Sequence, residues 1–259
     1  MSILEAVILG VVQGLTEFLP VSSSGHLIMF QAFFGIEEPA MMFNIVVHLG
    51  TLIPVLTVYR KEVFAIAFRP LQRYTYLILL GTLPAAAVAL LLGDNIDMLF
   101  GNPEFLPVTF LITALLLIYA DTRPEGRRRK KDMSYRDSLI IGCAQAVAIL
   151  PGISRSGSTI TAGIASGLNR DTAARYSFML SIPAISGGLT LELFRMYASD
   201  GTGASIGLLP TFVGFITAMF TGFLAINMLL SIIRRRRLRV FAYYLMILSA
   251  ALIVINIVF

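Results

Sequence analysis

The segment GLTEFLPVSSSGHL, residues 14–27, interrupts an apolar stretch with side chains that are costly to bury. Glu17, three serines at 22–24 and His26 all lie within it. Each of these groups loses hydration in an apolar environment and needs a polar partner there. Pro20 ends a helix that begins before it. The segment therefore predicts a broken helix whose turn carries functional side chains.

Composition places the chain in a membrane. It has 259 residues, of which 57% are hydrophobic and 14% charged, and a mean hydropathy of +0.82. These values exclude an ordinary soluble domain and indicate a polytopic membrane protein. The N-terminal segment carries Glu5 and no basic leader, so we expect it to be retained. The net charge of +5 resides in short loops between apolar spans, so no nucleic-acid partner is expected.

Hydropathy predicts six crossings and two interrupted segments. The expected transmembrane helices cover 42–59, 75–93, 105–120, 174–194, 209–231 and 240–258. Residues 1–36 and 137–168 are apolar but broken midway by Pro, Gly and Ser, which is typical of re-entrant hairpins that line a cavity. The predicted fold is an all-α integral membrane protein with six transmembrane helices and two re-entrant broken-helix hairpins. It forms one membrane domain over residues 1–259.

Loop charges predict the orientation. Segments 60–73, 121–136 and 234–239 are rich in Lys and Arg and are expected in the cytoplasm. Segments 94–104 and 195–208 are acidic or nearly neutral and are expected outside. The first broken segment is then entered from outside and the second from the cytoplasm.

The two halves align as an inverted-topology repeat, approximately 1–121 and 133–259. A shift of 132 residues superposes five identical pairs, which are Gly10 with Gly142, Gln13 with Gln145, Ser22 with Ser154, Ser24 with Ser156 and Gly25 with Gly157. In an inverted repeat, broken segments approach from opposite sides and their tips meet near the middle of the membrane.

The tips carry a lone acid and a lone base. Arg155 is the only Lys or Arg that falls within an apolar segment, and Glu17 is its acidic counterpart. One hypothesis is a structural salt bridge between the two hairpins, and the other is a functional site. Around Arg155, a helix start and the hydroxyls of Ser154, Ser156, Ser158 and Thr159 describe a phosphate cradle.

Other side chains suggest further chemistry. Gln13 and Glu17 are four residues apart and share a helix face, which suits a hard divalent cation such as Mg²⁺. His26 is a candidate general acid or base or attacking nitrogen, and Ser23 a candidate nucleophile. Each serine could equally be a helix cap. His48 is expected to be a satisfied polar residue with an accessory role as the alternative, and Cys143 a buried thiol.

Together, QGLTEFLPVSSSGHL (13–27) and PGISRSGSTI (151–160) resemble the paired signatures of the undecaprenyl-diphosphate phosphatase family, also called the bacitracin-resistance protein family. The resemblance implies an inner-membrane enzyme that removes one phosphate from a C55 isoprenoid diphosphate. This recycles the lipid carrier for peptidoglycan and other wall polymers. It also implies dependence on Mg²⁺ or Ca²⁺ and a site open to the external face.

Carried over by position, the resemblance implies four catalytic residues, which are Glu17, Ser23, His26 and Arg155. The implied substrate-binding residues are Gln13, Ser22, Ser24, Gly25, Ser154, Ser156, Gly157, Ser158 and Thr159. The implied metal ligands are Glu17 and Gln13. Many members have Glu at the position of Gln13, which puts a two-carboxylate metal site in doubt here.

The expected partners are the isoprenoid diphosphate and membrane lipids, and the oligomeric state, monomer or homodimer, is left open. So is the nucleophile, which is Ser23, His26 or a water. The alternative function is a transporter or flippase for an anionic lipid, because broken helices in inverted repeats also build such carriers. A structural scaffold is the third hypothesis, and it leaves the clustered hydroxyls unexplained.

Overall fold

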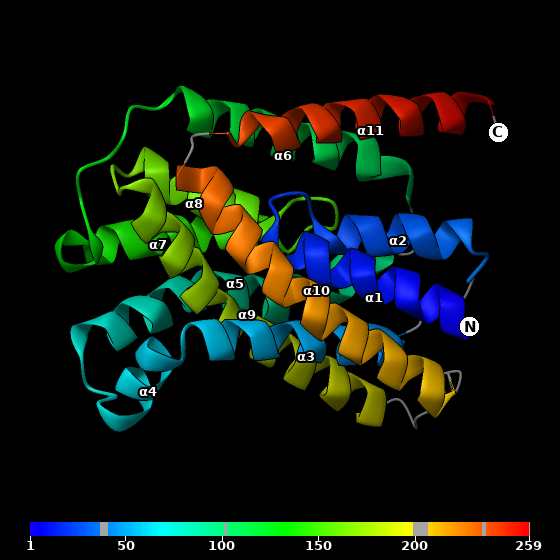
Figure 1. Ribbon diagram of the computed structural model, residues 1–259, viewed down its shortest axis with the longest axis horizontal. Helices are drawn as coiled ribbons and strands as arrows, with labels where there is room; N and C mark the ends of the chain where they lie inside the picture. The colour runs from blue at the N-terminus through cyan, green and yellow to red at the C-terminus, as the bar shows by residue number, and fades with distance from the viewer. Residues whose placement is uncertain (37–40, 101–102, 199–206, 235–236, 259) are drawn as a thin grey trace.

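The computed structural model describes the chain except for residues 37–40, 101–102, 199–206, 235–236 and 259. All the regular elements of the described residues are helices (Figure 1). They are α1 (Ile3–Phe18), α2 (Ser23–Phe33), α3 (Met41–Val58), α4 (Arg60–Phe68), α5 (Arg73–Phe100), η1 (Pro103–Phe105), α6 (Leu106–Thr122), η2 (Lys130–Asp132), α7 (Tyr135–Val147), α8 (Arg155–Ala165), α9 (Arg170–Ala198), α10 (Leu208–Arg234) and α11 (Arg239–Val258).

The helices confirm a multi-pass membrane protein. Five of those described, α5, α6, α9, α10 and α11, are long and apolar enough to cross a bilayer. The count becomes six when α3 and α4 are taken as one span with an 84° bend between them. How the two broken segments, α1–α2 and α7–α8, lie relative to the membrane stays a prediction.

Two predicted loops are partly helical. Residues 60–68 form α4, which turns sharply away from α3 at the edge of the bundle (Figure 1). α4 has no buried residue, and its Phe64 and Phe68 rings are exposed and stacked at 6.1 Å. A basic helix with exposed aromatic rings suits the membrane–water interface, which hydropathy alone did not reveal. α5 continues to Phe100 because nothing in 94–100 breaks a helix, so the predicted loop at 94 begins too early.

Parts of the predicted loops lie outside the described residues. They are 101–102 in the loop predicted at 94–104, 199–206 in the loop predicted at 195–208, and 235–236 in the third basic loop.

The local geometry recurs at the spacing of 132 residues. α1 and α7 begin at Ile3 and Tyr135, and α2 and α8 at Ser23 and Arg155. Each first helix starts with a capping box, Ser2 with Glu5 and Ser134 with Asp137. Close helix contacts recur as well, since a Cβ on Gly10 would lie 2.7 Å from the Gly214 carbonyl oxygen, and one on Gly142 would lie 2.5 Å from that of Gly81. These recurrences support the predicted repeat, whose boundaries and inversion stay predictions.

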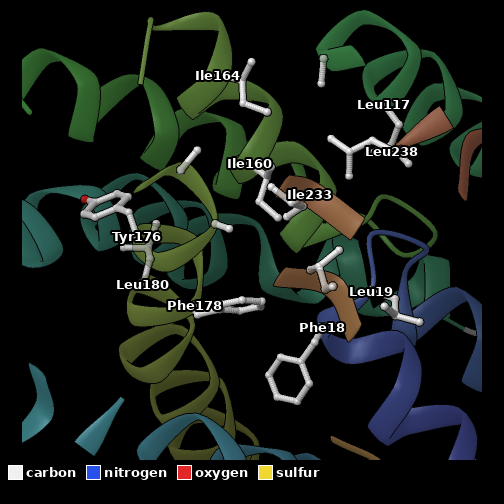
Figure 2. Packing of buried hydrophobic residues seen from close by; sticks show 14 of the residues in the cluster. Phe18, Leu19, Leu117, Ile160, Ile164, Tyr176, Phe178, Leu180, Ile233 and Leu238 are labelled. Atoms are coloured by element: carbon white, nitrogen blue, oxygen red, sulfur yellow. The ribbon is translucent and has the colours of Figure 1, made fainter. Parts of the chain in front are cut away.

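The core packs against the broken helices. Figure 2 shows Phe18 of α1, Ile160 of α8, Phe178 of α9 and Ile233 of α10 converging on one buried cluster. The Phe18 and Phe178 rings meet edge to face at 5.8 Å. In a lipid environment, such close packing and hydrogen bonds hold helices together, because burial from water contributes little. The cluster therefore fixes the ends of α1 and α8, from which the polar tips project.

Two side chains differ in burial from what the sequence suggested. Arg170 lies at a span end, as expected, since it begins α9, but it is only 2% exposed. Its guanidinium lies 3.4 Å from Asp121 and donates to the Ala120 and Arg123 carbonyls, so it ties α9 to the end of α6. Cys143, expected to be buried, is exposed on the outer face of α7, because the buried face of that helix holds its glycine and polar residues.

The glycine contact between α7 and α5 generates a stability prediction. Gly142→Ala places a methyl group against the Gly81 carbonyl, so we expect a loss of about 1–3 kcal/mol in unfolding free energy. The matched control is Gly187→Ala in α9, where a Cβ meets nothing within 4 Å. There alanine should be neutral or stabilising by up to about 1 kcal/mol. Thermal unfolding in detergent measures both, and equal melting temperatures would contradict the close approach.

Candidate functional site

The first tip is a strained turn between α1 and α2. α1 closes with the Leu19 amide donating to the Leu15 carbonyl at 3.2 Å, and Pro20 prevents its continuation. Ser22 then adopts φ of +71°, the only positive φ at a non-glycine position among the described residues. Its hydroxyl caps α2 by accepting from the Gly25 amide at 3.3 Å. Backbone strain of this kind is typical of functional sites.

The second tip, between α7 and α8, has the same kind of helix cap but carries its positive φ at another position. Gly152 turns the chain at φ of +84°, and Ser154 caps α8 by accepting from the Gly157 amide at 3.0 Å. Thr113 of α6 holds this turn, since its hydroxyl accepts from the Ser154 amide at 3.1 Å and donates to the Gly152 carbonyl at 3.3 Å. No periodicity in the sequence pointed to Thr113.

The two tips touch. A Cβ on Gly25 would lie 2.6 Å from the Phe110 ring and 3.0 Å from the Gly152 Cα, so the lack of a side chain at Gly25 allows this close approach. The Ser156 hydroxyl donates to the Leu19 carbonyl at 3.1 Å, which joins α8 to the turn after α1. The turn before α2 therefore lies against the start of α8. Helix starts of this kind can bind an anion through their first amides.

The contact brings the two intramembrane charges together. The Arg155 Nη2 atom donates to Glu17 Oε1 at 2.7 Å, and its Nη1 atom to the Ser177 carbonyl at 3.3 Å. The side chains of Arg155 and Glu17 are 15% and 7% exposed. The guanidinium thus spans α1 and α9 and keeps a partly open side.

The second oxygen of Glu17 has its own donors. Oε2 accepts from the Ser23 hydroxyl at 2.6 Å and from the Gln13 amide nitrogen at 3.1 Å. The His48 Nε2 atom lies 3.8 Å away. His48 donates from Nδ1 to the Asn44 carbonyl at 2.7 Å, which leaves Nε2 directed at Glu17. The Ser23 hydroxyl donates the shortest of these bonds, so Oε2 lies where an acceptor for its proton would have to lie.

A pocket of about 220 Å³ opens beside these groups. It is lined by Thr16, Glu17, Ser22, Ser23, Ser24, His48, Ala148, Ile149, Ile153, Ser154, Arg155, Ala184, Ile185, Gly188, Leu189 and Glu192. The last five residues form one stripe along α9. The pocket therefore runs from the two tips toward the end of α9.

The structure separates the predicted substrate-binding residues into two groups. Ser22, Ser24 and Ser154 line the pocket with three of the predicted catalytic residues, Glu17, Ser23 and Arg155. Gln13, Gly25, Ser156, Gly157, Ser158 and Thr159 are buried behind them. Thr159, for example, shares a 2.7 Å hydrogen bond with Ser177 and supports the helix that carries Arg155. Roles for individual residues stay predictions.

His26 does not face the pocket. Its ring is buried, donates from Nδ1 to the Ser22 carbonyl at 2.7 Å and accepts at Nε2 from the Tyr244 hydroxyl at 2.7 Å. The ring also lies against Phe110, with centroids 5.3 Å apart. Both nitrogens are occupied, so this geometry suits a support for the strained turn at Ser22. His48 has the polar partner that we expected, the Asn44 carbonyl, and it also lines the pocket, so its accessory role stays a prediction.

The described residues do not fit a resident divalent cation. Glu17 already has Arg155, Ser23 and Gln13 as donors, and Gln13 presents its amide nitrogen to Glu17. The Gln13 oxygen is buried without a partner and lies outside the pocket. Glu192, the other acid of the pocket, lies roughly 22 Å along α9 from Ser177. No group of three or more His, Cys, Asp or Glu among the described residues could hold a metal.

The fold and the site define a multi-pass helical membrane protein with a charged pocket between two helix tips. The sequence model of the bacitracin resistance protein BacA family matches residues 6–251, so the chain belongs to this family.

Relatives that align with this chain over almost their whole length carry the name undecaprenyl-diphosphatase. The chain is 44% identical to an undecaprenyl-diphosphatase of Carboxydothermus hydrogenoformans, over 99% of this chain and 98% of that protein. It is 38% identical to an undecaprenyl-diphosphatase of Methanosphaera stadtmanae, over 100% of this chain and 99% of that protein. A third, from Halothermothrix orenii, is 40% identical over 98% of both chains.

The place of Gln13 generates a prediction about metal binding. Gln13→Glu would set a second carboxylate against Glu17 and create the oxygen pair that a divalent cation prefers. We expect the unaltered protein alone to bind Mg²⁺ no tighter than about 1 mM, and the variant to bind it at least about tenfold more tightly. Calorimetric titration of chelator-treated protein with Mg²⁺ or Ca²⁺ measures this. Equal affinities would show that residue 13 lies outside any cation site.

Proposed function

We propose that this chain hydrolyses undecaprenyl diphosphate to undecaprenyl phosphate and inorganic phosphate. The proposal rests on one observation. The Ser23 hydroxyl and the Arg155 guanidinium both donate hydrogen bonds to Glu17, and all three residues line one pocket. The names of the relatives, all undecaprenyl-diphosphatases, support the same substrate.

The pocket suits a terminal phosphoryl group. Arg155 supplies a planar fork of donors, and the amides at the starts of α2 and α8 add fixed dipoles. Ser22 and Ser24 share one hydrogen bond, so one of their two hydroxyl protons is left to donate at the rim. Phosphoryl transfer requires mainly positioning and neutralisation of charge, and these groups supply both. The isoprenoid tail stays in the surrounding lipid.

Ser23 is the nucleophile that the geometry favours. Its oxygen attacks the terminal phosphorus while its proton passes to Glu17 Oε2, which already accepts that hydrogen bond at 2.6 Å. The bond from phosphorus to the bridging oxygen breaks, and the isoprenyl phosphate leaves. Water then cleaves the phosphoserine, which restores the Ser23 hydroxyl and releases inorganic phosphate. His26 faces away from the pocket, so we assign it the support of the turn.

A divalent cation, Mg²⁺ or Ca²⁺, would arrive as the counter-ion of the diphosphate substrate. The donors of the pocket leave no set of acidic ligands to retain it, since Arg155 already neutralises Glu17. In this proposal the protein's own residues position the phosphoryl group of the substrate.

The alternative function, a lipid transporter or flippase, would require different chemistry at the site. A carrier must bind its headgroup and release it intact, and it needs no hydroxyl bonded to a carboxylate. Purified protein in detergent, given a short-chain isoprenyl diphosphate, separates the two functions. The hydrolase releases inorganic phosphate there, whereas a carrier has no second compartment and releases none.

We place the enzyme in the inner membrane with its pocket open to the external face. The pocket follows α9 toward Glu192, and this end of α9 leads into the segment 195–208 that loop charge assigns outside. There it would meet the diphosphate left by wall-polymer synthesis and return the monophosphate carrier.

The variant Arg155→Lys tests whether Arg155 binds the phosphate of the substrate or only forms a salt bridge with Glu17. The two terminal nitrogens of Arg155 bond to different partners, Glu17 and Ser177, and lysine offers one nitrogen in place of this fork. Loss of one charge-assisted hydrogen bond, about 1.5–3 kcal/mol, should lower kcat/KM for phosphate release roughly 10- to 150-fold in Arg155→Lys.

The matched control for Arg155→Lys is Arg237→Lys in the basic loop. Lysine there also meets the positive-inside requirement, so we expect almost no change. Both rates are normalised to folded protein. Near-normal catalysis by Arg155→Lys would favour the salt-bridge hypothesis.

Thiol labelling tests the orientation in a Cys143→Ser background. Leu208 at the start of α10 and Arg127 in the basic loop 121–136 are both exposed, and each adjoins a segment that loop charge assigns to water. Leu208→Cys should react with an impermeant maleimide added to intact cells, and Arg127→Cys only after the membrane is opened. The reverse pattern would move the entrance of the pocket to the cytoplasm.

A further inference from the structure

A second concave surface lies at the basic end of the bundle, apart from the candidate site. It has a volume of about 600 Å³ and is lined by Gln72, Arg73, Tyr74, Leu77, Arg129, Lys130 and Lys131. Four of these seven residues are cationic and none is acidic. We call it the basic depression. The phosphatase chemistry proposed above uses none of its residues.

Two of the four cationic side chains of the depression, Arg73 and Lys130, are held in place by contacts within the protein. Arg73, the first residue of α5, donates to the Lys131 carbonyl at 3.3 Å and to the Met133 carbonyl. The Lys130 ammonium lies over the Tyr74 ring at 3.6 Å from its centroid. Two long side chains are thereby fixed at the wall before a ligand arrives, which lowers the entropy lost on binding an anion.

Neighbouring acids have other partners. The Asp132 carboxylate accepts from the Arg129 amide at 3.0 Å, and Asp137 pairs with Arg128. Glu62 faces Lys130 from a smaller adjoining pocket that it shares with Arg175. The charges that face the depression itself therefore remain positive and attract an anion.

Exposed apolar residues place the depression at the level of a membrane surface. Phe64 and Phe68 of α4 and Leu71 after it are exposed, as amphipathic interfacial segments require. On α5, Tyr76, Leu79 and Leu83 are 44%, 54% and 61% exposed and form a stripe that starts one turn beyond Arg73. A ligand in the depression thus has an apolar surface beside it. Acyl chains would contact this surface, whereas a soluble anion would not.

We propose that the basic depression binds the phosphate-bearing headgroup of an anionic membrane lipid, with its acyl chains along the exposed face of α5. Arg129 and Lys131 meet the phosphate from the loop, and Arg73 from the start of α5. Basic pockets at the cytoplasmic ends of membrane helices are suited to such headgroups.

Lipid binding to the purified full-length protein tests the proposal without any substrate, so its outcome is independent of phosphatase activity. The probes are short-chain phosphatidylglycerol, phosphatidylcholine and inorganic phosphate. Binding is followed by native mass spectrometry and by the shift in melting temperature. We expect phosphatidylglycerol to bind at least about tenfold more tightly than phosphatidylcholine, and inorganic phosphate at equal concentration neither to stabilise the protein nor to displace the lipid.

A pair of double variants identifies the site. Arg129→Gln with Lys131→Gln removes two exposed lining charges and should weaken phosphatidylglycerol binding roughly 30-fold, at about 1 kcal/mol per charge. Arg127→Gln with Arg136→Gln removes two exposed charges that do not line the depression, and it should change binding less than about threefold. Both should keep the melting temperature that the unaltered protein has without lipid, which shows that they fold.

Three results would overturn the proposal. Equal weakening in the two double variants would mean general surface charge. Equal binding of phosphatidylcholine would mean an apolar contact only. Displacement of the lipid by inorganic phosphate would mean a soluble anion as the ligand.

Discussion

The pair formed by Glu17 and Arg155 is the constraint on which the rest of the structure depends. A lone carboxylate inside an apolar bundle is unfavourable, and its removal from water is offset only by an opposite charge and further hydrogen bonds. Glu17 obtains the charge from Arg155 at 2.7 Å and the bonds from Ser23 and Gln13. The partners come from segments 138 residues apart, so the pair forces two distant turns into contact. The breaks at Pro20 and Gly152 and the close approach of Gly25 serve this meeting.

The repeat supplies the scaffold, and the chemistry arises where its halves differ. Ser22 and Ser154 cap their helices alike, and each shares a hydrogen bond with the serine two residues later. At the same shift of 132 residues, however, Glu17 corresponds to Ile149 and Ser23 to Arg155. One tip therefore brings the acid and the hydroxyl, and the other brings the cation. Two turns with the same helix cap thus form an asymmetric site, because these two pairs of side chains differ.

The sequence predicted the parts of the site that obey local rules. Crossings follow from apolar runs, and the tips follow from Pro20, Gly152 and the serines that cap helices, so the fold class and the Glu17–Arg155 meeting could be expected. Directions of side chains could not, because they depend on neighbours far along the chain. His26 turns toward Tyr244, 218 residues away, while His48 reaches Glu17 from α3. Arg170 lies at the span end that its charge suggests, yet its side chain is buried there against Asp121.

The pocket is open because α9 presents small residues to it. Ala184 and Gly188 are one turn apart on the stripe that faces the tips, and a Cβ on Gly188 would meet nothing within 4 Å. Larger residues there would fill the space beside Arg155, and its pairing with Glu17 would then be a buried structural bridge like that of Arg170 with Asp121. Arg170 is 2% exposed by its side chain, whereas Arg155 is 15% exposed and borders the pocket. In the mechanism proposed above, an incoming phosphate would compete for the guanidinium from its open side. Oε1 of Glu17 would then lose its partner while Oε2 stayed bonded to Ser23, which would couple binding of the substrate to activation of the hydroxyl through one carboxylate.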